Sequence, residues 1–330
     1  QDKRFQDWRE AAHDVHRLLV SSGALDESQG ALAGDALRAL LLAHVNAVSG
    51  LEMAGSGLDK NASVAIYPTF CRLEHSCLPN LVFYSEQDGP LEITVKARQR
   101  IKAGVSLSIS YVLLDEPTHR RQSSLKRDKY FWCGCGRCVG SGAEAEKPGD
   151  LCALRCAVAG CGGYVTPDGT NYATTRAVWH CSKCCSTAEF SRVEALEDEM
   201  VAAVETADSP EACDRVLQSF GSRLPKEHFV RFLCAAKNAE LLLRPVERQV
   251  LTGRGKEVPQ GLAERVLALY EEQVLPWALR RLPRYALQMH SSWCTIYYRL
   301  GQARLVLAMH RGGVNLLKAT LDAYSEALSE

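Results

Sequence analysis

The spacing of the cysteines constrains the fold of this chain more than any other feature of its sequence. There are 14 cysteines in 330 residues, and many of them stand in C-x-C-x-x-C, C-x4-C and C-x-x-C spacings. Such spacings are typical of zinc sites, whereas disulfide frameworks dominate in short secreted domains. The N-terminal stretch QDKRFQDWREAAHD also lacks the apolar core of a secretory signal. We therefore expect zinc thiolates rather than disulfides, and a reducing location in the cytoplasm, the nucleus or both.

The first cysteine group lies in the sequence YFWCGCGRC at 130–138. Cys133, Cys135 and Cys138 offer three thiolates, whereas a closed structural zinc site needs four ligands in a tetrahedron. Cys77 in the sequence HSC is the first candidate for the fourth ligand, and Cys71 is the alternative. With Cys77 as a ligand, the metal would join the end of the 46–140 region to its middle. Free buried thiols are the other interpretation of this group.

The second cysteine group lies in LRCAVAGCGGYVTP and WHCSKC. Two pairs about twenty residues apart, each in a turn-like context, are typical of a zinc ribbon, in which two knuckles hold one metal. The predicted ligands are Cys156, Cys161, Cys181 and Cys184, although Cys152 or Cys185 is able to replace one of them. This module has too few apolar residues for a core of its own, so we expect it to need metal to fold.

The remaining composition is that of a globular protein with balanced charge. Lys and Arg number 39, Asp and Glu number 39, and 46% of the residues are hydrophobic. No net field therefore directs the chain to nucleic acid or to an anionic membrane. No apolar run approaches the roughly 18–20 residues that span a bilayer. A nucleic-acid-binding zinc protein is disfavoured because basic and aromatic residues are not interleaved.

Hydrophobic periodicity predicts two helices, over 4–20 and 31–45, followed by a compact antiparallel β region. Alternation predicts strands within 81–84, 91–97 and 105–111. A basic helix, HRRQSSLKRDKYF, follows, and its charges are interpreted as a solvated face. After a linker at 140–150 and the second cysteine group, amphipathic helices continue to the C-terminus. The last two are expected within 285–328, with a break at 311–313, and have spacing reminiscent of tetratricopeptide hairpins. Cys213, Cys234 and Cys294 are predicted to be core residues.

Three stretches together resemble a known family. IYPTFCRLEHSCLPNL, LEITVKARQRIKAGVSLSISY and YFWCGCGRC resemble the C-terminal half of a SET domain and its post-SET cysteines. The SET and MYND group of protein-lysine methyltransferases shows Y-P, N-H-S-C-x-P-N, I-x-x-G-E-E-L-x-I-x-Y and F-x-C-x-C-x-x-C in this order. The resemblance covers about residues 46–140 closely.

The resemblance implies an α+β chain. Its parts would be a SET-type knotted β fold (C-terminal half) with a post-SET zinc site, a zinc-ribbon-like module and an α-helical, TPR-like C-terminal domain. The predicted domains are a helical SET insert (1–45), the C-terminal half of the SET domain (46–112), the post-SET segment (113–140), the zinc-ribbon-like module (141–190) and the helical-repeat-like domain (191–330).

The resemblance also implies a site that binds S-adenosylmethionine and a substrate lysine. Tyr111 takes the position of the catalytic tyrosine, whose phenol orients the lysine amine and helps to polarise the sulfonium methyl. Phe131 falls on the aromatic that lines the lysine channel or stacks near the cofactor, and Tyr67 falls on the Y-P tyrosine. The implied cofactor-binding residues are Asn46, Cys71, Leu73, Glu74 and His75, the last largely through its backbone.

The chain departs from the family pattern in three ways. Glu74 replaces the asparagine of N-H-S-C, and an ionised carboxylate repels the carboxylate of the cofactor. Val105 and Ser106 replace the two glutamates of the G-E-E turn. The N-terminal SET half and the MYND module are not found in the sequence, and the absence of an initiator Met also suggests a fragment.

Two functions of different classes follow. The first is a protein-lysine N-methyltransferase that uses S-adenosylmethionine, acts on a histone or another lysine-bearing protein, and is truncated in this sequence. The second is a catalytically inactive, zinc-stabilised interaction scaffold. In either case the helical C-terminal domain is a surface for a partner protein.

Overall fold

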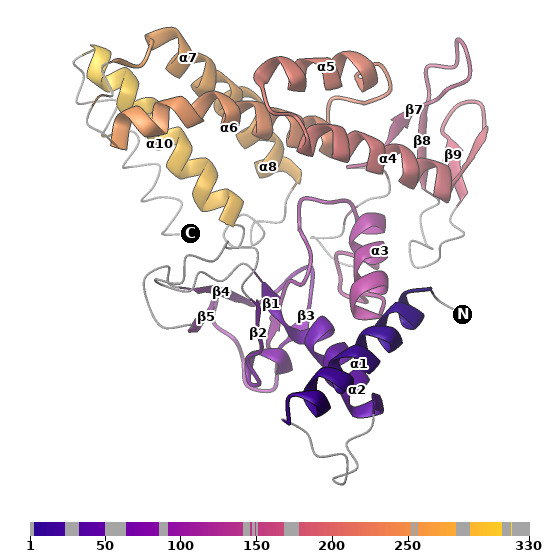
Figure 1. Cartoon of the computed structure of the whole chain (residues 1–330). Coiled ribbons are helices and arrows are strands. Elements are labelled where there is room, and N and C mark those ends of the chain that lie inside the picture. The colour runs from indigo at the N-terminus through magenta and orange to yellow at the C-terminus, as the bar shows by residue number, and fades with distance from the viewer. Residues whose placement is uncertain are drawn as a thin grey trace. The chain divides into compact units, whose positions relative to one another are not determined.

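The computed structural model describes residues 3–23, 33–49, 64–85, 92–140, 146, 149, 151–167, 178–251, 254, 257–281, 291–311 and 318. The chain forms two compact units (Figure 1). The first unit contains residues 1–74 and 80–109, and the second contains residues 75–79 and 110–330. Residues His75–Pro79 therefore belong to the second unit although their neighbours in sequence belong to the first, and all residues from Ser110 onward belong to the second unit.

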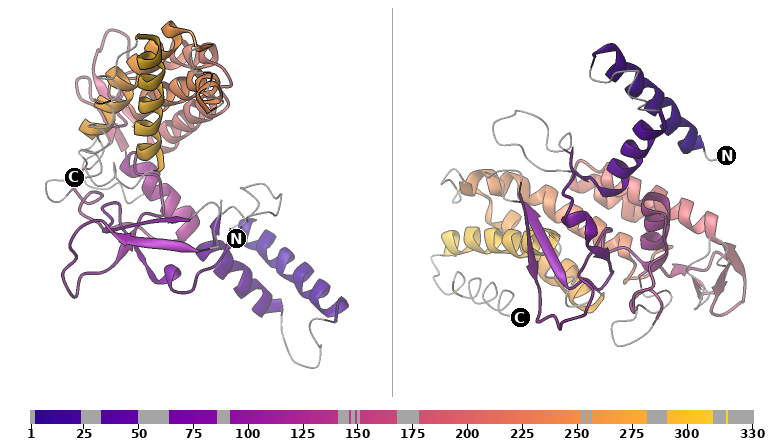
Figure 2. Two further views of the ribbon diagram at one scale, coloured as in Figure 1. Left: turned by 90° about the vertical axis from the view of Figure 1, so that its left-hand side faces the viewer. Right: turned by 90° about the horizontal axis from the view of Figure 1, so that it is seen from below.

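The first unit begins with a helical hairpin. Helices α1 (Lys3–Ser21) and α2 (Ala33–Asn46) lie side by side (Figure 2), with the rings of Trp8 and His44 4.9 Å apart. Their bounds confirm both helices predicted from the 3.6-residue periodicity. Strand β1 (Val48–Ser49) follows α2 directly and pairs antiparallel with β2 (Val64–Ala65).

The β structure of the first unit consists of short ladders. β4 (Leu81–Ser85) and β5 (Ile93–Ala97) pair antiparallel over five residues, with Tyr84 opposite Thr94. A 3-10 turn, η3 (Phe70–Arg72), places the Phe70 ring edge-on to the Phe83 ring at 4.8 Å. β3 (Glu74–His75) and β6 (Ser108–Ile109) are two residues long, and the Glu74 N–H donates to the Leu107 carbonyl at 3.1 Å.

The strand predicted over 105–111 is wrong in its extent. Val105 and Leu107 are 51% and 47% exposed, and only Ser108 and Ile109 form a strand. The physical reason is the side chain of Asn80, which donates to the Ser106 carbonyl at 2.8 Å and accepts the Ser108 N–H at 2.9 Å. A side chain thus satisfies backbone groups that a neighbouring strand would otherwise satisfy.

In the second unit, α3 (Thr118–Lys129) leads to the first cysteine group. The interpretation of its charges as a solvated face is wrong for the first half of the helix. Arg121 is fully buried, and Arg120 donates to Asp198 at 2.7 Å, while Lys126 and Arg127 are exposed. Most buried polar groups are hydrogen-bonded, and the first turns of α3 pack through hydrogen bonds as well as through the ring of His119.

A four-stranded antiparallel sheet in the order β10-β9-β8-β7 contains the second cysteine group. Trp179 on β9 is fully buried, and its ring lies edge-on to the ring of His119, with 5.3 Å between the ring centroids. The strands are β7 (Leu154–Arg155), β8 (Tyr164–Pro167), β9 (Val178–Cys181) and β10 (Thr187–Glu189).

Helices make up the rest of the second unit (Figure 1). They are α4 (Phe190–Glu205), α5 (Pro210–Phe220), α6 (Phe229–Leu251), α7 (Gln260–Ala268), the π-helical turn η5 (Leu269–Val274), α8 (Leu275–Arg281) and α10 (Ser291–Arg311). Their core includes Met200, Phe229 and Val266, which agrees with the amphipathic helices predicted for this part of the chain. Their tetratricopeptide character stays a prediction. The helix expected after Gly313 and the side chain of Cys294 lie outside the described residues.

Within the described part of the chain, no helix combines the length and the apolar character that crossing a membrane requires.

Candidate functional site

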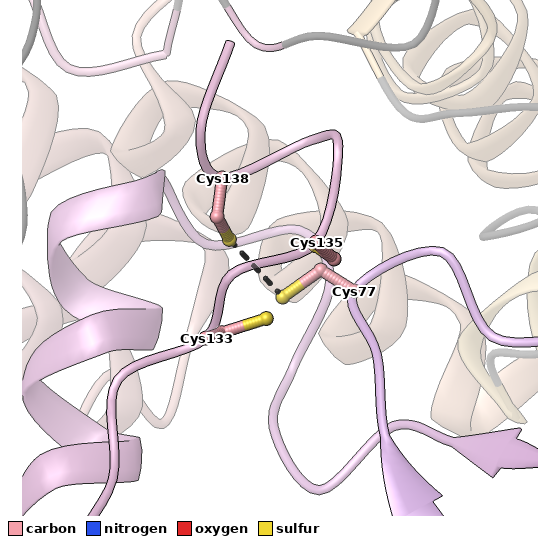
Figure 3. A group of neighbouring side chains, drawn as sticks. All are labelled: Cys77, Cys133, Cys135 and Cys138. Atoms are coloured by element: carbon pink, nitrogen blue, oxygen red, sulfur yellow. Dashed lines mark hydrogen bonds between the residues drawn. The ribbon is translucent and has the colours of Figure 1, made fainter. Parts of the chain in front are cut away.

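The first cysteine centre consists of Cys77, Cys133, Cys135 and Cys138, whose sulfur atoms all lie within 4.8 Å of one another (Figure 3). The Cys138 and Cys77 sulfurs are 3.5 Å apart, although the residues are 61 positions apart in sequence. A tetrahedral zinc with bonds of about 2.3 Å to sulfur needs thiolates about 3.8 Å apart. The predicted four-cysteine group is confirmed as a cluster that fits zinc.

Local hydrogen bonds hold the three cysteines of 133–138 in place. Helix α3 ends at Lys129, and the left-handed backbone of the following Tyr130 (φ 65°) turns the chain back. The Gln122 side chain then clamps Cys133, donating to its carbonyl and accepting its N–H, both at 2.8 Å. The Cys138 N–H closes the next turn on the Cys135 carbonyl at 2.9 Å. The cysteines are therefore positioned by α3 as well as by their own spacing.

The electrostatics of the first centre favour a thiolate at Cys77, whereas hydrogen bonds among the four thiols raise the pKa of Cys133 and of Cys138. The hydrogen bonds of the three other thiols and the nearby Arg121 guanidinium lower the pKa of Cys77 well below its usual value, against the effect of burial. The Arg121 Nε donates to the Cys77 sulfur at 3.3 Å. Thiolates are the form that binds metal, so Cys77 has the protonation state of a metal ligand.

The second cysteine centre consists of Cys156, Cys161, Cys181 and Cys184, which also gather within 4.8 Å. The Cys156 and Cys184 sulfurs are 3.6 Å apart, and those of Cys161 and Cys181 are 3.5 Å apart. Two turns approach each other so closely that a Cβ at Gly163 would stand 2.7 Å from the Cys181 sulfur. This is the knuckle geometry predicted for a zinc ribbon.

The two spare cysteines do not belong to the second centre. Cys152 is buried, Cys185 is exposed with a φ of 56°, and neither joins the four clustered sulfurs. The described cysteines form no disulfide. Cys213 and Cys234 are fully buried, and the Cys234 thiol donates to the Cys213 carbonyl at 3.3 Å, which confirms them as core residues.

The predicted catalytic residues of the second unit form one aromatic group. The ring of His75 lies 5.2 Å from the Tyr111 ring and 5.8 Å from the Phe131 ring, and Tyr111 and Phe131 are edge-to-face at 6.4 Å. The Tyr111 N–H donates to His75 Nδ1 at 3.0 Å, and His75 Nε2 is 3.4 Å from the Cys77 sulfur. Lys129 lies with its Nζ over the Tyr111 ring at 5.5 Å.

The remaining predicted site residues belong to the first unit. The Cys71 N–H donates to the Tyr67 carbonyl at 2.9 Å, and its thiol donates to the Asn46 carbonyl at 3.4 Å. Tyr67, Cys71 and Asn46 are thus brought together. Leu73 is half-buried after η3, whereas Glu74 is exposed on β3.

Sequence reasoning missed the polar groups that support the first centre. Arg121 and Gln122 were within the run interpreted as solvated, and Glu146 was within the predicted linker. Glu146 accepts the Thr118 N–H at 2.7 Å and ion-pairs with Arg121 at 2.9 Å. The same stretch also contains Glu144 and Asp150, so nothing in the sequence singles out Glu146 as the anchor.

Comparison with known proteins adds partial matches. No protein-family model matches the chain. A SET and MYND domain-containing protein of Dictyostelium discoideum is 42% identical over 82 residues, covering 25% of this chain and 20% of that protein. The histone-lysine N-methyltransferase ASHR1 of Arabidopsis thaliana is 29% identical over 155 residues, covering 46% and 31%. The N-lysine methyltransferase SMYD2 of Homo sapiens is 32% identical over 108 residues, covering 33% and 24%.

The chain spans about a fifth to a third of the length of these relatives. The order of the motifs, the first cysteine centre and the names of the relatives all indicate a SET domain. Over the matched part of its length the chain is similar to the SET and MYND domain-containing proteins and to SMYD2, and these relatives support a SMYD-like SET protein.

Proposed function

We propose that this protein is a protein-lysine N-methyltransferase that uses S-adenosylmethionine. The observation that carries the proposal is the grouping of Tyr111 with His75 and Phe131 beside the first cysteine centre. These are the residue types of the SET motif, in its order. Relatives named as lysine methyltransferases support the same reaction class.

The residues of the chain would divide the work as follows. S-adenosylmethionine supplies the methyl group when bound. The Tyr111 phenol orients the lysine amine by hydrogen bonding, which places the amine in line for transfer. Phe131 would supply an apolar wall for the lysine side chain. Tyr67, which belongs to the first unit, keeps the role that the family motif implies for it. His75 holds the Tyr111 backbone through its ring.

The proposed cofactor-binding residues fit the cofactor in part. Asn46 and Cys71 lie together, as a common binding stretch requires. Leu73 and His75 flank Glu74 in the chain and supply backbone groups. Glu74 fits less well, because a carboxylate accepts hydrogen bonds only and repels the carboxylate of the cofactor.

We assign zinc to both cysteine centres in a structural role. Four thiolates fill the coordination of zinc, so a closed centre has no open position for catalysis. The substrate would be a protein with a target lysine, histone or non-histone, and the helical region of the second unit would receive a partner protein. A location in the cytoplasm, the nucleus or both belongs to the same proposal.

A methyl-transfer assay tests the proposal. The protein is incubated with radiolabelled S-adenosylmethionine and either histones or a lysine-rich protein extract. Tyr111→Phe should lower turnover about 100-fold or more, because one transition-state hydrogen-bond donor is removed. Tyr164→Phe, at an exposed tyrosine of β8, is the control and should leave turnover unchanged. Equal turnover in wild type and Tyr111→Phe would contradict the role of Tyr111.

The second candidate is an inactive, zinc-stabilised scaffold, and Glu74 is the observation that favours it. Its signature would be full zinc loading without S-adenosylmethionine binding in calorimetry and without transfer to any protein. Cofactor binding together with transfer would exclude it.

A further inference from the structure

A fully buried cation adjoins the first cysteine centre. The Arg121 guanidinium donates from Nε to the Cys77 sulfur at 3.3 Å and from Nη2 to the Cys138 sulfur at 3.6 Å. Its side chain has no solvent exposure. Arg121 also donates to Thr118 Oγ1 at 2.8 Å and to the Glu116 carbonyl. This side chain therefore has one fixed position, with two of its nitrogen atoms directed at two of the four sulfurs.

The charges around Arg121 do not balance without the sulfurs. Glu146 Oε2 accepts from Arg121 at 2.9 Å and from Arg137 at 3.0 Å, so one carboxylate serves two buried guanidinium groups. The Nη1 of Arg137 has no hydrogen-bond partner among the described residues. One positive charge is left over in the interior, and an uncompensated buried charge is strongly destabilising.

A metal thiolate supplies the missing negative charge. One divalent cation bound by four thiolates carries a net charge of about −2, which exceeds the single positive charge left by the two arginines and Glu146. The Nε and Nη2 of Arg121 donate to the Cys77 and Cys138 sulfurs, the kind of atom on which that negative charge resides. The buried cation is therefore explained when the centre holds its metal.

We infer that Arg121 is a positioning residue of the first cysteine centre, which holds the sulfurs of Cys77 and Cys138 and neutralises the charge of the metal-bound thiolates. Glu146 keeps the guanidinium in place. The inference rests on the proposed zinc site and is independent of methyl transfer. Loss of a hydrogen-bond partner of a metal ligand typically lowers metal affinity about 10- to 100-fold.

The test uses the full 330-residue chain and zinc ions in competition with a chromogenic chelator. Arg121→Met keeps the length of the side chain and removes the charge and the donors. We expect it to weaken zinc binding at the first centre about 10- to 100-fold and to leave the second centre unchanged. Alkylation of freed thiols, followed by peptide mass spectrometry, identifies the centre that has lost its metal. Arg127→Met, at an exposed arginine of the same helix, is the matched control and should bind two zinc ions as wild type does.

A second variant separates this role from folding. Arg121→Gln alone removes the charge while Glu146 stays paired with Arg137 at 3.0 Å, so no buried charge is left without a partner. The inference predicts that this variant folds, retains zinc at the second centre and binds it weakly at the first. Wild-type affinity at the first centre in either variant would overturn the inference. Equal weakening of both centres would also overturn it, because the substitution would then act through the general fold. The inference would also be overturned if the first centre of the wild-type protein binds no zinc, whether or not the protein transfers methyl groups to a substrate.

Discussion

At the scale of single residues, His75 contacts both the first cysteine centre and the proposed catalytic tyrosine. Its Nδ1 accepts the Tyr111 N–H, so in the neutral ring the proton must reside on Nε2. That proton faces the Cys77 sulfur at 3.4 Å, where a metal-bound thiolate would accept it. One side chain thus fixes the backbone of Tyr111 on one side and a metal ligand on the other, and its tautomer is set by both partners.

His75→Phe should loosen this connection. The ring shape is retained, but the half-buried Tyr111 N–H loses its acceptor, which costs about 1–3 kcal/mol of unfolding free energy. Denaturant unfolding measures the loss, and the methyl-transfer assay should show a lower kcat with less effect on KM. His180→Phe, at an exposed histidine of β9, is the control. Unchanged stability and kcat in His75→Phe would mean that Tyr111 is positioned without the imidazole.

At the scale of elements, α3 joins two parts of the second unit. One side of the helix supplies Arg121 and Gln122 to the first cysteine centre. The other side buries His119, whose Nε2 lies 2.6 Å from the Glu197 carboxylate of α4. His228, at the start of α6, approaches the second oxygen of Glu197 at 4.0 Å. The helix is therefore held by polar contacts at both faces.

Acid should weaken the contacts between these helices through His228. Burial, followed by the charges of His119, Arg231 and Arg120, lowers the pKa of His228 to about 3. Since the unfolded residue titrates near 6.5, the unfolded state binds more protons between about pH 6.5 and pH 3, and stability falls as the pH falls through this window. Glu197 also faces the ring, from α4, and His119 and Arg120 face it from α3.

The difference in unfolding free energy between wild type and His228→Leu isolates this contribution, because metal loss in acid affects both proteins. We expect the difference to shrink by about 1.4 kcal/mol per pH unit between pH 6 and pH 4. A difference that does not change with pH would show that His228 is not buried as a neutral ring.

The same helix shows where prediction from sequence ends. Periodicity located α1 and α2 because their apolar residues recur every three to four positions in the sequence. In α3 only Leu125 among the buried residues is apolar; the others are Thr118, His119, Arg121 and Gln122. A polar buried face has no hydrophobic periodicity and depends on distant partners such as Glu146 and Glu197, which no local pattern specifies. The strand lost at 105–107 has the same cause, since Asn80 satisfies that backbone from 26 residues away.

At the scale of the whole molecule, the cysteine spacing predicted both cysteine centres because ligand geometry is local within each knuckle. The partner of Cys138 at Cys77 was predicted from its place in the motif. The structure adds that residues 75–79 belong to the second unit, while their neighbours on both sides belong to the first. Such a short segment has no compositional mark, and it carries Cys77, whose sulfur belongs to the first cysteine centre.

Metal removal should therefore unfold part of the second unit. Binding of structural zinc is tied to folding, and β7–β10 place few apolar residues in the core besides Trp179, Leu154 and Val165. Treatment with a strong chelator should release two zinc ions per chain, lower the melting temperature and shift the Trp179 emission to the red as the buried indole meets water. The emission of Trp179→Phe should change much less, which assigns the signal to β9. Restoring zinc should restore the emission. Release of zinc without a change in the emission of wild type would show that the sheet is held by its packing against α3 and α4 instead of by the metal.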